Sequence, residues 1–218
     1  MPSQKSRKQE LAANLEKILN ELVSAQLIAV SKNYPISDIQ ILYELGQRDF
    51  GENRVQELSE KAQELKVVCP DIRWHFIGKL QSNKLNQLAK VSNLVAIHSI
   101  DSLSLLQKIQ TKIELKNLLL FLQVKTSDEA EKQGFENLEE LKTAANDYAI
   151  FGLMTMGKIR TEDLAKDAVE CFQKCRSIRN KIDKDLKLSM GMSQDYLIAQ
   201  ECESDYVRVG SSLFASKN

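Results

Sequence analysis

Short apolar runs alternate with longer amphipathic stretches along this chain of 218 residues. Eight runs have the length and composition of buried strands: 27–32, 48–53, 73–78, 94–99, 118–125, 150–156, 186–191 and 206–210. Short runs bounded by polar residues are typical of parallel strands buried on both faces. The stretches between them are long enough for helices, so the pattern predicts strands joined by crossover helices.

The helical stretches show apolar stripes and end signals. A helix is expected over 5–24, and Ser37 with Gln40 predicts a capping box for the next one, which Gly46 would end. Asp101 is expected to cap a further helix. The apolar stripes comprise Leu11, Leu15, Ile18, Leu19 and Leu22; Val55, Leu58, Ala62 and Leu65; Leu105, Leu106, Ile109 and Ile113; and Leu164, Ala168, Cys171, Cys175 and Ile178.

Two arrangements fit alternating strands and helices: an open doubly wound sheet and a closed barrel. The glycine-rich dinucleotide fingerprint of the open fold is absent, and eight units are the number that a barrel requires. With only 8 glycines and 3 prolines, no linker divides the chain. We therefore expect an α/β fold with a single (β/α)8 TIM-type barrel domain over 1–218, in which residues 1–24 form an extra N-terminal helix that packs on the barrel.

Composition narrows the function classes. Thirty basic residues balance thirty acidic ones, which argues against a nucleic-acid partner. No apolar run is long enough to span a membrane, and the basic N-terminus lacks the apolar core of a secretory signal. Cys171 and Cys175 have the spacing of half a zinc site, but no second Cys/His pair completes it. A cytoplasmic protein with buried reduced thiols and no metal is expected.

Polar residues gather where the predicted strands end, which is where barrels of this type place their sites. They are Ser31 and Lys32, Glu52 and Asn53, His75 to Gly78, His98 and Ser99, Lys125 and Thr126, Met154 to Gly157, Gly191 to Ser193, and Arg208 to Ser212.

The last of these stretches, "VRVGSSLF", has the features of a phosphate site. Loops after the seventh and eighth strands often bind phosphate with backbone N–H groups, and Gly210 permits close approach. Ser193 and Ser211 would add hydroxyl groups, although both serines also fit ordinary helix caps. Closure of the barrel places Lys32 beside the eighth strand. Lys32 could then be a surface lysine, a phosphate clamp or an amine nucleophile.

Other polar motifs are weaker. His75 could serve as an acid or base, but a hydrogen-bonded structural histidine is the preferred interpretation. His98, Ser99 and Asp101 contain the residue types of a catalytic triad without its geometry. Residues 152–158 imitate the spacing of a P-loop but lack the hydroxyl that binds magnesium. Lys79 is interpreted as a loop residue, with a role in accepting displaced cofactor as the alternative.

Six motifs occur in an order and spacing that resemble a known family: "AVSKNYP", "FGENRVQE", "WHFIGKLQSNK", "GLMTMG", "LSMGMSQDY" and "VRVGSSLF". They resemble the pyridoxal 5′-phosphate homeostasis proteins, a single-domain family similar to the N-terminal barrel of alanine racemase. The resemblance runs from about residue 26 to 215. Arg54, Lys79 and Ala215 depart from the residues that are common in the family.

The resemblance implies roles for six residues toward pyridoxal 5′-phosphate. Lys32 would form an aldimine with the cofactor, and Asn53 would lie near the aldimine side of the ring. Ser193, Gly210 and Ser211 would hold the phosphate, and Arg208 would face the pyridine nitrogen. It implies no catalytic residue. A protonated guanidinium donates a hydrogen bond but does not readily supply a proton, which makes the cofactor a weaker electron sink.

The resemblance also implies a function. Racemases with a related barrel carry a second domain, and this chain stops eight residues after Gly210, which leaves no room for one. We therefore expect a protein that carries or buffers pyridoxal phosphate in vitamin B6 and amino-acid homeostasis, without catalytic turnover.

The alternatives are a slow amino-acid racemase and, more distantly, a Schiff-base aldolase. Expected partners are the cofactor, amino acids and apoenzymes that use the cofactor, with no nucleic acid or membrane. The protein is expected to be a monomer or weak dimer.

Overall fold

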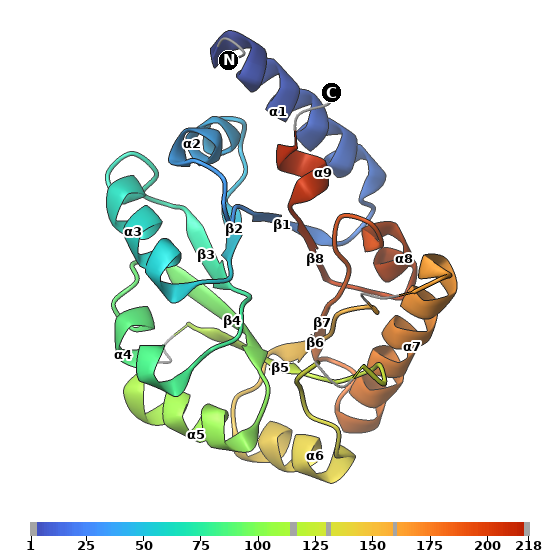
Figure 1. Ribbon diagram of the computed structural model, residues 1–218. Coiled ribbons are helices and arrows are strands. Elements are labelled where there is room, and N and C mark those ends of the chain that lie inside the picture. Colours follow the sequence, from blue (N-terminus) through green and yellow to red (C-terminus); the bar gives the residue numbers. More distant parts are fainter. Residues whose placement is uncertain (1–3, 114–116, 130–131, 159–160, 216–218) are drawn as a thin grey trace.

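The protein folds into a closed barrel of parallel strands surrounded by helices (Figure 1). The computed structural model describes residues 4–113, 117–129, 132–158 and 161–215. Each strand pairs with the next along the chain, and the last pairs with the first. The strands are β1 (Gln26–Val30), β2 (Asp49–Glu52), β3 (Arg73–Phe76), β4 (Leu94–Ile100), β5 (Leu119–Gln123), β6 (Gly152–Met154), β7 (Lys187–Ser189) and β8 (Tyr206–Val209).

Helices form the outer layer of the barrel. They are α1 (Gln4–Glu21), α2 (Ile36–Glu44), α3 (Val55–Leu65), α4 (Leu85–Leu88), α5 (Leu103–Lys112), α6 (Leu138–Asp147), α7 (Leu164–Ile182), α8 (Tyr196–Glu201) and α9 (Ser211–Phe214), with a 3₁₀ turn, η1 (Ser82–Lys84), before α4. The predicted alternation of strands and helices and the barrel closure are confirmed. Each predicted strand is found, although most are shorter than the apolar run that predicted them.

The main hydrophobic core lies between the barrel and its helices. Outward-facing strand residues such as Phe50, Trp74 and Val207 are fully buried against helix residues such as Leu58 and Leu106. A second, smaller apolar cluster of Ala96, Phe121 and Met154 is separate from this core. Side chains thus fill both faces of the sheet, as the nearly continuous apolar strands require.

The N-terminal helix α1 packs beside α2 and α9 (Figure 1). Arg7 donates to Asp38 on α2 and to the carbonyl oxygen of Phe214 on α9, each at 2.6 Å. Asn14 Nδ2 donates to Leu213 O at 3.0 Å. These contacts join the first helix to the last, next to the strands that close the barrel.

Three local predictions were wrong. Helix α2 begins at Ile36 directly after Pro35, whose φ of −70° already suits a helix start, so Ser37 lies inside the first turn and makes no capping box. The cap of α5 is Ser102, one residue after Asp101, and its Oγ accepts from the Leu105 N–H. Leu19 is exposed, because the packed face of α1 is narrower than predicted.

Two further findings bear on function. Within the described ranges, no helix has the length and apolar character needed to cross a membrane. The part of the chain that the structure describes also contains no group of three or more His, Cys, Asp or Glu side chains placed to hold a metal ion.

Candidate functional site

The turn after β1, residues 31–33, carries Lys32 and is called the lysine turn below. Ser31 directly follows β1, and its N–H donates to Gly51 O on β2 at 3.0 Å. The chain then reverses, with the Tyr34 N–H donating to Ser31 O at 3.0 Å and Asn33 at φ 65°. Asparagine adopts this left-handed conformation more readily than most residues. The turn leaves the Lys32 side chain exposed at the C-terminal end of the barrel.

An ionic cluster of the buried residues Glu52 and Lys61 and the half-buried Glu57 holds both ends of the lysine turn. Lys61 Nζ, from α3, donates to Glu52 Oε1 at 2.8 Å and to Glu57 Oε1 at 2.7 Å. It also donates to Ser31 O at 2.7 Å. Glu52 Oε1 accepts from Ser31 Oγ at 2.6 Å, and Glu57 Oε1 accepts from the Asn33 N–H at 2.8 Å. The cluster therefore fixes the residues on either side of Lys32.

Burial and pairing act differently on the two carboxylates of this cluster. Burial raises the pKa of Glu52, and the hydrogen bonds from Lys61 and Ser31 offset only part of that effect. Burial acts in the same direction on Glu57, but its hydrogen bonds from Lys61 and Asn33 outweigh it and lower its pKa. Glu52 Oε2 has no hydrogen-bond partner among the described residues. Lys61 is thus the charge that compensates the deeply buried Glu52.

Ser193 connects the loop after β7 to the start of α9. Its Oγ accepts from the backbone N–H of Gly210 at 3.1 Å and of Ser212 at 3.3 Å, and Ser212 Oγ donates to Ser193 O at 3.2 Å. Ser193 caps α9 from another loop, whereas Ser211 lies inside α9, whose N-cap is Gly210. Backbone N–H groups that converge on one oxygen in this way can also donate hydrogen bonds to a phosphate oxygen.

Barrel closure brings the lysine turn next to this loop. A Cβ atom placed on Gly210 would lie 3.2 Å from Val30 O, so glycine allows β8 to end tightly against β1. The Tyr34 ring stacks on Phe214 of α9, with ring centroids 4.4 Å apart and an interplanar angle of 15°. Residues from the two ends of the sequence therefore form one surface.

Arg208 points into the barrel from β8 and is 4% exposed. Its Nη1 donates to Ser189 O and Ser189 Oγ, each at 2.7 Å, and its Nη2 donates to Thr155 O at 2.9 Å. Burial lowers the pKa of Arg208 to about 10, so the guanidinium remains protonated at neutral pH. Arg208 is a fixed positive donor at the ends of β6 and β7.

Asn53 follows β2 and is half-buried at the same end of the barrel. The loop after β3 lies directly against it, since a Cβ atom on Gly78 would stand 1.9 Å from Asn53 O. Only glycine allows the two backbones this approach, and the Gly78 carbonyl also accepts from Ser99 Oγ. The position of Asn53 is therefore set by a backbone contact.

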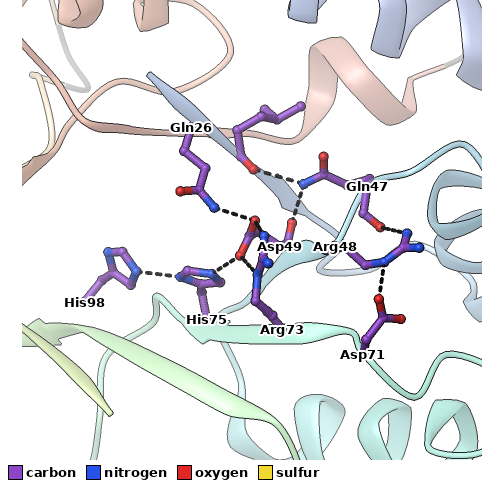
Figure 2. A network of polar contacts seen from close by, with 9 residues as sticks. Gln26, Gln47, Arg48, Asp49, Asp71, Arg73, His75 and His98 are labelled. Atoms are coloured by element: carbon purple, nitrogen blue, oxygen red, sulfur yellow. Dashed lines mark hydrogen bonds and ion pairs between the residues drawn. The ribbon is translucent and has the colours of Figure 1, made fainter. Parts of the chain in front are cut away.

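His75 is the last but one residue of β3, and His98 lies two residues before the end of β4, but neither side chain is exposed at the barrel end. His75 and His98 lie inside the barrel, 1% and 0% exposed. His75 Nε2 pairs with Asp49, the first residue of β2, at 2.9 Å (Figure 2). The preferred interpretation of His75 as a hydrogen-bonded histidine is confirmed.

Several weaker predictions have plain outcomes. Lys79 is exposed in the loop after β3. The cysteines are free and buried, as expected for Cys171 and Cys175. Residues 152–158, which have the spacing of a P-loop, begin with the buried strand β6. They therefore do not form a phosphate-binding loop between two glycines.

Sequence reasoning missed the residues that support the site. Lys61, Ser189 and Asp49 contact predicted residues, and Glu57 contacts Asn33 beside Lys32, yet none of the four was singled out. One signal was available for α3, where Lys61 lies within the apolar face and Glu57 precedes it by one helical turn. The contacts of Ser189 and Asp49 depend on the register between neighbouring strands, which the pattern of apolar residues does not determine.

Comparisons with a family model, two relatives and a solved structure give consistent results. Residues 7–218 match the sequence model of the alanine racemase N-terminal domain. The pyridoxal phosphate homeostasis protein of Schizosaccharomyces pombe is 40% identical over 202 residues, covering 88% of this chain and 84% of the relative. The human protein of that name is 36% identical over 215 residues, covering 90% and 78%. The structure of PipY from Synechococcus elongatus with PLP bound is 33% identical, with a TM-score of 0.81, covering 94% of this chain and 100% of that one.

Proposed function

Because the chain belongs to the pyridoxal phosphate homeostasis proteins, within the alanine racemase N-terminal domain family, we propose that it binds pyridoxal phosphate at the C-terminal end of the barrel. It would carry or buffer the cofactor in vitamin B6 and amino-acid homeostasis, without catalytic turnover. The observation that carries the proposal is the gathering of Lys32, Arg208 and the Ser193 loop at one end of the barrel.

The residues present fit this cofactor. The N–H groups of Gly210 and Ser212 converge on the Ser193 oxygen, so they are already oriented toward an acceptor. Ser193, Gly210 and Ser211 would hold the phosphate group. Arg208 has donors beyond its three described hydrogen bonds, and one of them would face the pyridine nitrogen. Asn53 would lie beside the ring.

Lys32 would hold the cofactor covalently. When bound, pyridoxal phosphate supplies an aldehyde that condenses with an amine and a pyridine ring that withdraws electrons from the linked carbon. The Lys32 amine is accessible, and the ionic cluster orients the lysine turn from both sides. Covalent attachment forms a carbon–nitrogen bond at the aldehyde carbon, and the carbonyl oxygen leaves as water.

Arg208 supports a carrier over an enzyme. A guanidinium with a pKa of about 10 remains a hydrogen-bond donor at neutral pH and retains its proton, so the pyridine nitrogen beside it stays unprotonated. An unprotonated ring withdraws electrons less strongly, which disfavours removal of a proton from a bound amino acid. The exchange of cofactor with amino acids and with apoenzymes is part of this proposal.

Absorbance before and after borohydride tests the proposal. Protein incubated with pyridoxal phosphate should absorb visible light, and borohydride should bleach it and fix the cofactor to Lys32, as located by peptide mass spectrometry. Lys32→Ala should abolish the fixed adduct. Lys79→Ala, which changes another exposed lysine near the barrel end, should leave the adduct intact. A protein that takes up no cofactor, or an adduct on Lys79, would contradict the assignment.

A slow amino-acid racemase is the second candidate, favoured by the match to the alanine racemase N-terminal domain. The holoprotein incubated with L-amino acids in deuterated water distinguishes the two. A carrier exchanges cofactor without placing deuterium on the α-carbon, whereas a racemase incorporates deuterium there and forms the D-amino acid.

A further inference from the structure

A continuous line of hydrogen bonds crosses the barrel interior from Asp49 to Arg208. His75 Nε2 pairs with Asp49 Oδ1 at 2.9 Å, and His75 Nδ1 pairs with His98 Nε2 at 3.0 Å (Figure 2). His98 Nδ1 pairs with Ser189 Oγ at 3.0 Å, and Ser189 Oγ accepts from Arg208 Nη1 at 2.7 Å. Asp49 begins β2, whereas Ser189 ends β7, so the line connects the two ends of the barrel.

Asp49 is held as a carboxylate. Its oxygens accept from Arg73 Nε at 2.7 Å and from Gln26 Nε2 at 2.6 Å, in addition to the contact with His75. Burial opposes ionisation of Asp49, but the hydrogen bonds from Arg73 and His75 outweigh it and keep the pKa of the carboxyl well below its usual range. An ionised carboxylate only accepts hydrogen bonds, so the proton between it and His75 belongs to His75 Nε2.

This one proton sets the others along the line. If Nε2 carries the only ring proton of His75, then Nδ1 presents a lone pair and His98 Nε2 is the donor of the hydrogen bond between the two rings. Burial, aided by the positive charge of Arg208, lowers the pKa of His98 well below its usual value, so His98 is neutral. Its Nδ1 therefore accepts a hydrogen bond from the Ser189 hydroxyl group. The lone pairs of the Ser189 oxygen remain available to Arg208.

We propose that Asp49 is a positioning residue for the cofactor end of the barrel. Through His75 and His98, its negative charge orders the hydrogen bonds so that the Ser189 hydroxyl donates to His98 Nδ1, and no His98 N–H competes with Arg208 for the lone pairs of the Ser189 oxygen. The guanidinium is thereby held at the ends of β6 and β7 with its other donors directed by Ser189 and Thr155. The effect on cofactor binding rests on the proposed function, whereas the order of the hydrogen bonds does not.

The first test uses the unmodified apoprotein. The chain has 2 histidines, so protein labelled with ¹⁵N in histidine gives ring signals from His75 and His98 alone. Long-range ¹H–¹⁵N correlation should show both rings neutral and protonated at Nε2 at pH 7. A proton on Nδ1 of either ring would overturn the proposal, whatever the protein binds.

The second test compares Asp49→Ala with Asp71→Ala. Without the carboxylate, His75 Nε2 loses the acceptor that holds its proton. We expect that proton on Nδ1 instead, where it faces His98. The reversal should pass to His98, which does not contact Asp49. Asp71 is the matched control, because it lies at the same end of the barrel and pairs with Arg48 outside the line (Figure 2). A His98 ring protonated only at Nε2 in a folded Asp49→Ala protein would contradict the proposal.

The third test measures the affinity for pyridoxal phosphate by fluorescence titration. Asp49→Ala should weaken binding about fivefold, the equivalent of one hydrogen bond, and Asp71→Ala should change it by less than about twofold. Ser189→Ala should weaken binding to a similar extent while both histidines stay protonated at Nε2, because Asp49 still orders them. Unchanged affinity in both Asp49→Ala and Ser189→Ala would overturn the positioning role of Asp49. Failure of the unmodified protein to bind pyridoxal phosphate would refute only the proposed function.

Discussion

Replacement of Lys61 by methionine should destabilise the protein strongly. Lys61 is 6% exposed, and its partner Glu52 is 0% exposed. The substitution removes hydrogen bonds of 2.7 to 2.8 Å to Glu52, Glu57 and Ser31, while methionine retains most of the packing of the side chain. It leaves the Glu52 carboxylate buried without its counter-ion, which costs about 3–5 kcal/mol in comparable buried pairs.

The raised pKa of Glu52 places the expected loss at the lower end of that range. An isolated buried carboxylate takes up a proton at part of this cost, so we expect a loss of about 3 kcal/mol at pH 7. Because the folded-state pKa of Glu52 is raised further in the variant, its contribution favours folding at low pH and is lost as the pH rises through that pKa. The loss should therefore be smaller at pH 5 than at pH 8.

Urea unfolding measures this effect. With a slope of about 3 kcal/mol per molar urea, the midpoint of Lys61→Met should fall by about 1 M. The double variant Glu52→Gln with Lys61→Met should recover at least half of the loss, because no buried charge remains. Lys66→Met is the control, since Lys66 is exposed at the end of the same helix. A loss below about 1 kcal/mol, or no recovery in the double variant, would refute the assignment of Lys61 as the compensating charge.

Three further predictions follow from buried groups and close contacts. The low folded-state pKa of Asp49 stabilises the protein above the unfolded pKa of about 3.9, and this stability is lost as the pH falls toward the folded value. Asp49→Ala should therefore lower stability by about 2 kcal/mol or more at pH 7 in urea unfolding, with a smaller difference at pH 3. Burial raises the pKa of Cys175 to about 12, so iodoacetamide at pH 8 should label it only after unfolding; rapid labelling of the native protein would contradict its burial. Gly78→Ala should cost about 3 kcal/mol by thermal unfolding, because its Cβ would overlap the Asn53 carbonyl, and an unchanged Tm would show that the two loops separate readily.

The fold was predictable because its signals are local. The alternation of apolar runs and helical stripes reports the barrel directly, and Gly46 ends α2 with a φ of 101° as a glycine after a helix should. The errors concern residues whose choice depends on a neighbour. Ser37 and Asp101 both resemble caps, but Pro35 and Ser102 occupy the cap positions.

The candidate site divides in the same way. Lys32, Gly210 and Arg208 stand at strand ends that the sequence locates. Their supports depend on register and on helix packing, which apolar periodicity does not determine. His75 lies opposite Gly51 in the sheet, and its ring reaches Asp49 rather than the C-terminal rim. No local pattern in "RWHFIG" distinguishes these two directions.

The pairing of β8 with β1 has a consequence for biosynthesis. Lys32 leaves the ribosome well before Arg208 and Gly210, because almost the whole barrel lies between them in the sequence. Contacts between such distant segments form late, because the closure entropy of the intervening chain opposes them until the other strands are in place. If the proposed function holds, a nascent chain without its eighth strand cannot retain the cofactor. Retention of pyridoxal phosphate would then distinguish finished barrels from incomplete ones in the cell.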